Sequence, residues 1–314
     1  MSDNLNTTVN GTQPSTCSSD PTAEKIGQTF AYCLVFLVSL AGNTAIGIIV
    51  YQKKTMRKPI NFLIVNMAMS DLLFPIFVIP REMQNLYIDS WLIGGPLGQA
   101  FCKLAYFLTY VSIAVSTQSM VLIAVGRFGA VVYPLRSLLI SSKLCPFFIL
   151  TTWIVAVACL CPGLFSMKLV EYPEGLYCVF QRNEAFESYF LSLLVVGVFV
   201  PLVVIAILYI LILLKLKSQR SPGEQSANAG QQRQQRERDV LKMAIAIVLG
   251  FAVCWLPNTI VGLLYIFTSD IWSCGFHYLR TVAIFMVRAN CAINPCICFI
   301  FSRNYREGLK TLLS

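Results

Sequence analysis

The chain has 314 residues, of which 56% are hydrophobic and 12% are charged, and its formal net charge is +9. A soluble domain carries roughly 25% charged residues, so this composition excludes an ordinary water-soluble fold. The dominance of apolar residues also excludes a disordered chain. The mean hydropathy of +0.68 therefore predicts an integral membrane protein.

Seven stretches are apolar and long enough to cross a bilayer, which takes about 20 residues. In chain order they are Phe30–Tyr51, Ile60–Ile79, Phe101–Val125, Pro146–Phe165, Tyr189–Leu214, Met243–Phe267 and Thr281–Phe301. Residues 1–26 are polar, lack the basic start of a cleaved signal peptide, and form the predicted N-terminal segment. The predicted bundle spans 27–301, and 302–314 forms an amphipathic helix with a short tail. The fold class is an all-α membrane protein, a seven-transmembrane helix bundle with a short amphipathic eighth helix.

The distribution of basic residues predicts how the chain crosses the membrane. With the N-terminus outside, 17 of the 24 Lys and Arg residues lie in the inner connections and the tail. The positive-inside rule then predicts a multi-pass plasma-membrane protein with an extracellular N-terminus and a cytoplasmic C-terminus. Two glycosylation sequons, at Asn6 and Asn10, lie in the segment that this orientation places outside.

The longest predicted connection is the third inner one, at about 215–242. Its middle, 218–235, is rich in Ser, Gly, Gln and Asn, which predicts a solvated linker. The basic residues that flank it lie at the membrane edge, where they can contact anionic membrane lipid.

Polar side chains inside the predicted spans are candidate functional groups, because each costs several kcal/mol in lipid unless it faces protein or water. Asn290 and Asn294 lie four residues apart on one helical face, and Asp71 lies near the middle of the second stretch. Together with Ser116 in the third stretch, they predict one buried polar cluster. Its carboxylate requires either a cation or a proton.

These residues resemble the rhodopsin-like G-protein-coupled receptors from about Phe30 to Thr311. The matching motifs are Gly42-Asn43, Asn66-Met67-Ala68-Met69-Ser70-Asp71-Leu72, Trp91-Leu92-Ile93-Gly94, Cys102, Trp153, Cys178, Pro201, Tyr209, Cys254-Trp255-Leu256-Pro257, Asn290 and Asn294-Pro295. Within the family, the regions Trp91–Leu104 and Gln118–Leu135 look most like the neuropeptide branch, near receptors for RFamide-type and galanin-like peptides.

The resemblance implies the function of several residues. It implies a disulfide between Cys102 and Cys178, an extracellular peptide ligand, a heterotrimeric G protein and an arrestin as partners, and no nucleic acid. It also implies an allosteric Na⁺ at Asp71, whose pocket is completed by Ser116, Asn290 and Asn294. A water-filled network around a protonated Asp71 is the alternative. The residues implied for coupling and activation are Arg127, Tyr209, Glu237, Trp255, Pro257 and Pro295.

Two motifs depart from the family pattern. The acidic residue before Arg127 is replaced by Gly126, and the tyrosine of the motif after Asn294-Pro295 is replaced by Cys298. In the family the acid helps to hold the arginine in the inactive state, and the tyrosine helps to stabilise the active state. The departures keep a weakly coupling or decoy receptor open as an alternative, and they leave Glu237 as the predicted partner of Arg127.

The ligand class is narrowed by single positions. Thr109 replaces the aspartate of amine receptors, and Arg288 replaces the retinal lysine of opsins, where a guanidinium is too weak a nucleophile for a Schiff base. The predicted outer face carries ten acidic and six basic residues, an acidic surface that would attract a basic peptide, although solvated loop acids are an equal alternative. The candidate ligand-binding residues are Glu82, Thr109, Tyr110, Trp255, Arg280 and Arg288.

Arg288 is the hardest of these to explain as packing, because an isolated guanidinium is costly at this depth. It requires a partner, either Glu82 or an anionic group on the ligand, and the internal pair with Glu82 is the favoured prediction.

The sequence leaves two other interpretations open. Cys17 and Cys274 could form a second disulfide, and a seven-span transporter or channel lined by Asp71 and Arg288 is the alternative from another class. The sequence lacks the phosphate loops, metal-binding histidine pairs and nucleophile elbows of enzymes. An enzyme is therefore not predicted, and no cofactor is expected beyond the Na⁺.

Overall fold

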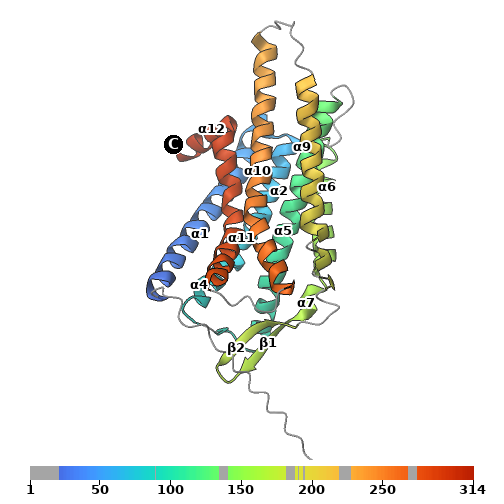
Figure 1. The fold of residues 1–314 in the computed structure, drawn as a ribbon. Helices are drawn as coiled ribbons and strands as arrows, with labels where there is room; N and C mark the ends of the chain where they lie inside the picture. Colours follow the sequence, from blue (N-terminus) through green and yellow to red (C-terminus); the bar gives the residue numbers. More distant parts are fainter. Residues whose placement is uncertain are drawn as a thin grey trace, which may run out of the picture.

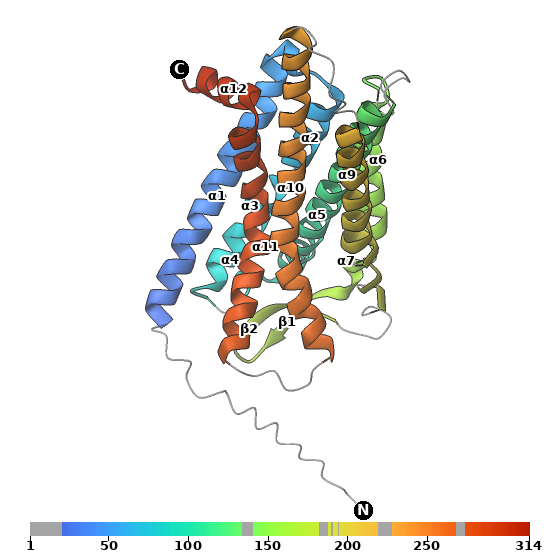
Figure 2. The same ribbon diagram turned by 45° about the horizontal axis from the view of Figure 1, so that its top comes forward.

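The computed structural model describes residues 21–88, 90–133, 141–181, 188–189, 191–193, 195–218, 228–267 and 274–314. Within them, seven helical segments are long and apolar enough to cross a membrane. The long helices run side by side in one bundle (Figures 1 and 2). The predicted seven-helix fold is therefore confirmed.

The first three spans fill the N-terminal half of the bundle. Their elements are α1 (Pro21–Gln52), η1 (Lys54–Met56), α2 (Pro59–Asp71), α3 (Leu73–Phe77), α4 (Ile79–Asn85) and α5 (Gly95–Val132). α2, α3 and α4 form one interrupted span, Pro59–Asn85. Pro75 and Pro80 lie in this span, and each removes a backbone N–H from the helical ladder, which explains why the helix is broken.

The other four spans complete the bundle. Their elements are α6 (Cys145–Leu160), α7 (Gly163–Ser166), η2 (Val195–Phe199), α9 (Val200–Ser218), α10 (Asn228–Phe267) and α11 (Cys274–Phe301), followed by α12 (Arg303–Leu313). η2 is a π-helical turn that ends two residues before Pro201, whose missing N–H interrupts the normal ladder. α5 lies at the centre, in contact with α2, α6 and α9, while α11 packs between α1 and α10.

Most predicted span ends lie within a few residues of the helical segments, but the second span reaches Asn85 and the third covers Gly95–Val132, so both are longer than predicted. Two other predicted boundaries are wrong. α1 begins at Pro21, so its first turns include residues that were assigned to the N-terminal segment. α10 begins at Asn228, so the prediction of a solvated linker is wrong for 228–235. This part of the chain is polar, but its Ala, Gln and Arg residues are good helix formers, and it extends a helix that is stabilised further along.

A β-hairpin, which composition did not predict, covers one end of the bundle. β1 (Met167–Tyr172) pairs antiparallel with β2 (Gly175–Phe180), with Leu169 opposite Cys178. Gly175 has φ +141°, a backbone conformation that a side chain disfavours, and it allows the tight turn. We call this end of the bundle, where Cys178 is bonded to Cys102, the disulfide end.

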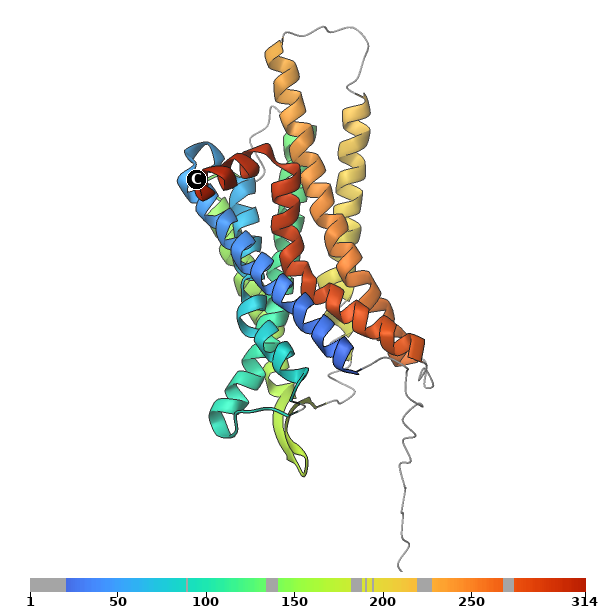
Figure 3. The same ribbon diagram turned by 90° about the vertical axis from the view of Figure 1, so that its left-hand side faces the viewer.

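The amphipathic helix α12 lies at the opposite end, where it turns away from α11 (Figure 3). Its buried face carries Tyr305, which packs edge-on against Phe299 with ring centroids 6.5 Å apart. On its exposed face, a hydrogen bond of 2.6 Å from Arg303 lowers the pKa of the Glu307 carboxyl. The predicted eighth helix is confirmed.

Candidate functional site

The middle of the bundle contains a cluster of buried polar side chains that we call the Asp71 cluster: Asp71, Ser116, Asn290 and Asn294. Asp71 comes from α2, Ser116 from α5, and both asparagines come from α11. Asn294 Nδ2 donates a 2.7 Å hydrogen bond to Asp71 Oδ2, across 223 residues of sequence. The structure therefore buries all four residues that the sequence analysis grouped and joins two of them by a hydrogen bond, while the role of the set as an ion site stays a prediction.

Three oxygens of the Asp71 cluster have no hydrogen-bond donor within the described residues. They are Ser116 Oγ, Asn290 Oδ1 and Asn294 Oδ1, and each is enclosed by protein. Buried polar groups nearly always have a partner. These oxygens, beside a buried carboxylate, therefore form a donor set suited to a cation or to ordered water.

α1 and α11 are joined at a break in the backbone ladder of α11. Pro295 cannot donate a hydrogen bond, so the carbonyl of Cys291, four residues earlier, lacks its helical donor. Asn43 Nδ2 donates to this carbonyl at 2.9 Å, and Ser39 Oγ donates to it at 3.3 Å. The polar residues of α1 therefore satisfy a backbone group that a proline in α11 leaves open.

A second buried network joins α2, α5 and α6. Asn66 Nδ2 donates to Ser119 Oγ at 2.9 Å and to Thr152 Oγ1 at 3.2 Å, while Asn66 Oδ1 accepts a 2.8 Å hydrogen bond from Trp153 Nε1. The amide of Asn66 thus binds partners on two other helices. This network explains why polar groups are tolerated at this depth.

Nearer the disulfide end, Arg288 of α11 forms an ion pair with Glu82 of α4, with 2.5 Å between Nη2 and Oε2. The predicted internal pair is confirmed. Arg288 also donates a hydrogen bond from Nη1 to the hydroxyl of Tyr32, whose ring lies under the guanidinium at 5.5 Å. We call Tyr32, Glu82 and Arg288 the Arg288 cluster; it joins α1, α4 and α11.

Sequence reasoning missed Tyr32 and Arg81. Tyr32 reads as one more aromatic residue in an apolar stretch, and only the packing of α1 against α11 gives its hydroxyl a role. Arg81 was counted as an outward base, but it is partly buried and donates to the Tyr106 hydroxyl at 2.9 Å. The available signal was an arginine adjacent to Glu82 in a stretch with few other charges.

The remaining candidate ligand residues differ in their surroundings. Thr109 is partly buried and donates its hydroxyl to the carbonyl of Ala105 in its own helix, at 2.7 Å. Trp255 is buried and stacks on Phe251 with ring centroids 5.8 Å apart. Tyr110 is partly buried in α5, whereas Arg280 is exposed near the start of α11. Their roles in ligand binding stay predictions.

The hairpin is fixed to the bundle by more than one bond. Cys178 of β2 forms a disulfide with Cys102 of α5, as the resemblance implied. Gln99 of α5 adds two hydrogen bonds to β1, from Nε2 to Met167 O at 3.1 Å and from Leu169 N to Oε1 at 2.9 Å. The hairpin therefore has a defined position over the disulfide end.

The residues implied for coupling lie at different depths along the bundle. Tyr209 and Cys298 are buried, and the Tyr209 hydroxyl has no hydrogen-bond partner among the described residues. Pro257 lies inside α10 and Pro295 inside α11. Arg127 lies in α5 and Glu237 in α10, but the side chain of Glu237 is outside the described part, so their pairing stays a prediction.

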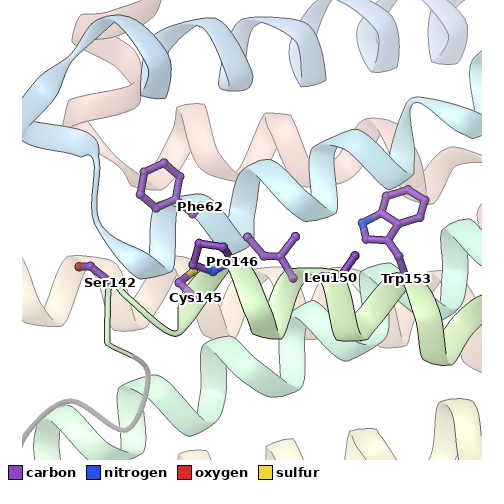
Figure 4. Close-up of a pocket in the computed structure, with 7 residues that line it drawn as sticks. Phe62, Ser142, Cys145, Pro146, Leu150 and Trp153 are labelled. Atoms are coloured by element: carbon purple, nitrogen blue, oxygen red, sulfur yellow. The ribbon is translucent and has the colours of Figure 1, made fainter.

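Several other predictions fall on parts that are not described. The sequons at Asn6 and Asn10 lie outside the described residues, as does Cys17, so the pair of Cys17 with Cys274 stays untested. A shallow groove of about 320 Å³ lies between α2 and α6, lined by Phe62, Ser142, Cys145, Pro146, Ile149, Leu150 and Trp153 (Figure 4). It contains none of the predicted site residues.

Comparison with known proteins places this geometry in a family. The pattern of the family described as 7 transmembrane receptor (rhodopsin family) matches residues 42–297. The QRFP-like peptide receptor of Branchiostoma floridae is 30% identical over 305 residues, covering 93% of this chain and 78% of its own length. Neuropeptide FF receptor 1 of Rattus norvegicus is 28% identical, and the match covers 89% of this chain and 68% of that receptor. The RYamide receptor of Drosophila melanogaster is 27% identical, and the match covers 90% of this chain and 62% of that receptor.

The chain belongs to the rhodopsin family of seven-transmembrane receptors. It is a multi-pass membrane protein and a receptor rather than an enzyme. The resemblance to the neuropeptide branch is confirmed by these relatives, and the transporter or channel alternative is set aside.

Proposed function

We propose that this receptor binds an extracellular peptide that carries a basic group, and that it then activates heterotrimeric G proteins at the plasma membrane. The observation that carries the proposal is the Glu82–Arg288 ion pair at the disulfide end, where the Glu82 side chain is 13% exposed. A basic ligand group would compete with Arg288 for this carboxylate. Because Arg288 belongs to α11, breaking the pair would couple binding to movement of that helix.

Two further observations support the proposal. Three relatives are named for peptides: a QRFP-like peptide, neuropeptide FF and RYamide. The disulfide between Cys102 and Cys178 supports an extracellular location of the hairpin, because such bonds persist in an oxidising compartment. The hairpin follows the fourth span, so an extracellular hairpin implies an extracellular N-terminus. Three further spans follow the hairpin, so the C-terminus would be cytoplasmic.

The activation step follows from a weak point in α10. The carbonyl of Val253 has no helical donor, because Pro257 lacks an N–H, so the helix bends there at low cost. Ligand contact near Trp255 would move the part of α10 beyond this point and open a groove for a G-protein helix. Arg127 and Tyr209 would line that groove, and Glu237 would restrain Arg127 beforehand.

The test uses cells that express the receptor with a reporter for a promiscuous G protein. A panel of amidated peptides containing arginine is compared with the same peptides carrying citrulline, which has the same shape without the charge. Glu82→Gln should weaken the response to the arginine peptides about tenfold, in line with the loss of one charged hydrogen bond, and leave any response to citrulline peptides unchanged. Equal losses for both series would refute recognition of a basic group by Glu82.

A receptor that binds its ligand without activating G protein is the second candidate, and Gly126 and Cys298 favour it. Nucleotide exchange on a purified G protein, measured with the purified receptor and an active peptide, separates the two. Binding with no increase in exchange would replace the first proposal by the second.

We further propose that the Asp71 cluster holds Na⁺ in the inactive state. The support is the buried carboxylate beside three oxygens without donors. Antagonist binding measured in sodium chloride and in N-methylglucamine chloride tests this proposal. The wild-type receptor should bind the antagonist more tightly in sodium chloride, whereas the affinity of the Asp71→Asn variant should be the same in both salts. Equal affinity in both salts for the wild type would favour water in the cluster instead.

A further inference from the structure

A second charged feature at the disulfide end is separate from the Arg288 cluster. A crevice of about 250 Å³ lies between α4, the segment after it and the start of α5. Its lining includes Phe77, Arg81, Trp91, Phe101 and Leu104. Phe77, Phe101 and Leu104 are about 40% exposed on a membrane-spanning bundle, so the mouth of the crevice faces lipid.

The guanidinium of Arg81 is held between two aromatic rings in the wall of this crevice. It lies 4.5 Å from the ring centroid of Tyr106 and 5.3 Å from that of Trp91. Nη2 donates to the Tyr106 hydroxyl at 2.9 Å. These contacts fix the position of the guanidinium, but Tyr106 and Trp91 carry no negative charge and therefore do not neutralise it.

No carboxylate of the described residues lies within ion-pairing distance of Arg81, and the adjacent Glu82 is paired with Arg288. Two donors in the wall, Arg81 Nε and Trp91 Nε1, are enclosed and have no acceptor within the same residues. The remaining nitrogen of Arg81, Nη1, has no hydrogen-bond partner there either, and it is not sealed off. Within the described residues, the crevice therefore presents positive charge and hydrogen-bond donors but no anionic side chain.

We propose that this crevice binds the phosphate group of a phospholipid in the leaflet at the disulfide end. Arginine suits phosphate, because its planar donors match the oxygens. Trp91 supports a position of the crevice at the depth of the lipid headgroups, since tryptophan is enriched at the interface between membrane and water. The acyl chains would lie along Phe77, Phe101 and Leu104, whose exposed surfaces continue from the charged end of the crevice.

The test uses the purified full chain in detergent micelles with a phosphatidylcholine analogue that carries a photoreactive diazirine on one acyl chain. After irradiation, mass spectrometry of peptides quantifies labelling of α4 and of the first turns of α5. Arg81→Gln should reduce labelling there about tenfold, the effect of losing one charged hydrogen bond. Leu104→Trp, which fills the crevice from its lipid-facing side and leaves Arg81 intact, should reduce it as well.

Two controls make the result specific. Arg57→Gln removes another arginine that lies over a tyrosine ring, 5.6 Å from Tyr51 at the opposite end of the bundle, and it should leave labelling of the crevice unchanged. A diazirine diacylglycerol without phosphate should label the crevice weakly. Equal labelling by the two lipids, or undiminished labelling of a folded Arg81→Gln variant, would overturn the proposal. Displacement of the lipid by inorganic phosphate alone would assign the crevice to a free anion and overturn it too.

Discussion

The side chain of Asn43 donates a 2.9 Å hydrogen bond to the carbonyl oxygen of Cys291, 248 residues further along the chain. This carbonyl is the one that Pro295 leaves without a helical donor. The same amide nitrogen lies 2.9 Å from the backbone oxygen of Ser39 in its own helix. One asparagine of α1 therefore stabilises a helix break in α11 and fixes the distance between the two helices.

Asn43→Ala is expected to destabilise the receptor by about 1–3 kcal/mol, the cost of leaving a buried acceptor unsatisfied. Thermal unfolding of the detergent-solubilised protein, followed by tryptophan fluorescence, measures the loss. Asn304→Ala, at an exposed position of α12, is the control and should be neutral. Identical unfolding temperatures for the two variants would contradict a structural role for the Asn43 hydrogen bond.

Gly42 makes the same contact between α1 and α11 through close packing. A Cβ added to Gly42 would lie 2.6 Å from Pro295 Cβ and 2.8 Å from its Cγ, so the helices would have to separate. Gly42→Ala should cost about 1–3 kcal/mol through overpacking. At Gly47, five residues later in α1, an added Cβ meets nothing within 4 Å. Gly47→Ala should be neutral or stabilising by up to about 1 kcal/mol. If Gly42→Ala is as stable as Gly47→Ala, the helices can separate at Gly42 without cost and the prediction is wrong.

The Glu82–Arg288 pair is tested by a double-mutant cycle. Glu82→Ala and Arg288→Ala should each lower the unfolding temperature, because each leaves a partly buried charge without its partner. The double variant should lose less than the two single losses combined, with a coupling of about 1–3 kcal/mol. Strictly additive losses would mean that the contact contributes nothing to stability. Parallel measurements on Tyr32→Phe separate the ion pair from the hydrogen bond to the tyrosine hydroxyl.

Cys298 stands where the family pattern has a tyrosine, and the structure shows how little space surrounds it. Cys298 has no exposed surface, whereas Cys296, two residues earlier, is exposed. Cys298→Tyr should therefore destabilise the receptor by about 1–3 kcal/mol through overpacking, while Cys296→Tyr should change stability little. The same thermal measurement compares them, and a stable Cys298→Tyr variant would indicate that α12 and Tyr305 move to accept the larger ring.

The sequence contained enough information for the fold. Hydropathy and the length of each apolar stretch are local properties, so they predicted seven spans whose bounds agree with the structure to within a few residues at most ends. Polar residues in an apolar stretch are also visible locally, and their cost in lipid identified Asp71, Asn290, Asn294 and Arg288 as candidates. Amphipathic periodicity likewise predicted α12.

Local patterns gave less information about partners and breaks. The linker was predicted too long, because polarity alone does not separate a solvated loop from a polar helical segment such as the start of α10. The β-hairpin was missed, since the segment is short and its pairing depends on the turn at Gly175 and on the bonds to α5. Sequence alone also treated Arg81 as a surface charge.

The sequence by itself determined the number of spans, the buried polar residues and the departures at Gly126 and Cys298. Only the tertiary structure decided that Tyr32 meets Arg288, that Asn43 meets Cys291, and that Arg81 lies between Trp91 and Tyr106. The physical reason is that each of these contacts joins different segments of the bundle. Whether their side chains meet depends on proline breaks, helix rotation and close packing, which arise only when the whole bundle assembles.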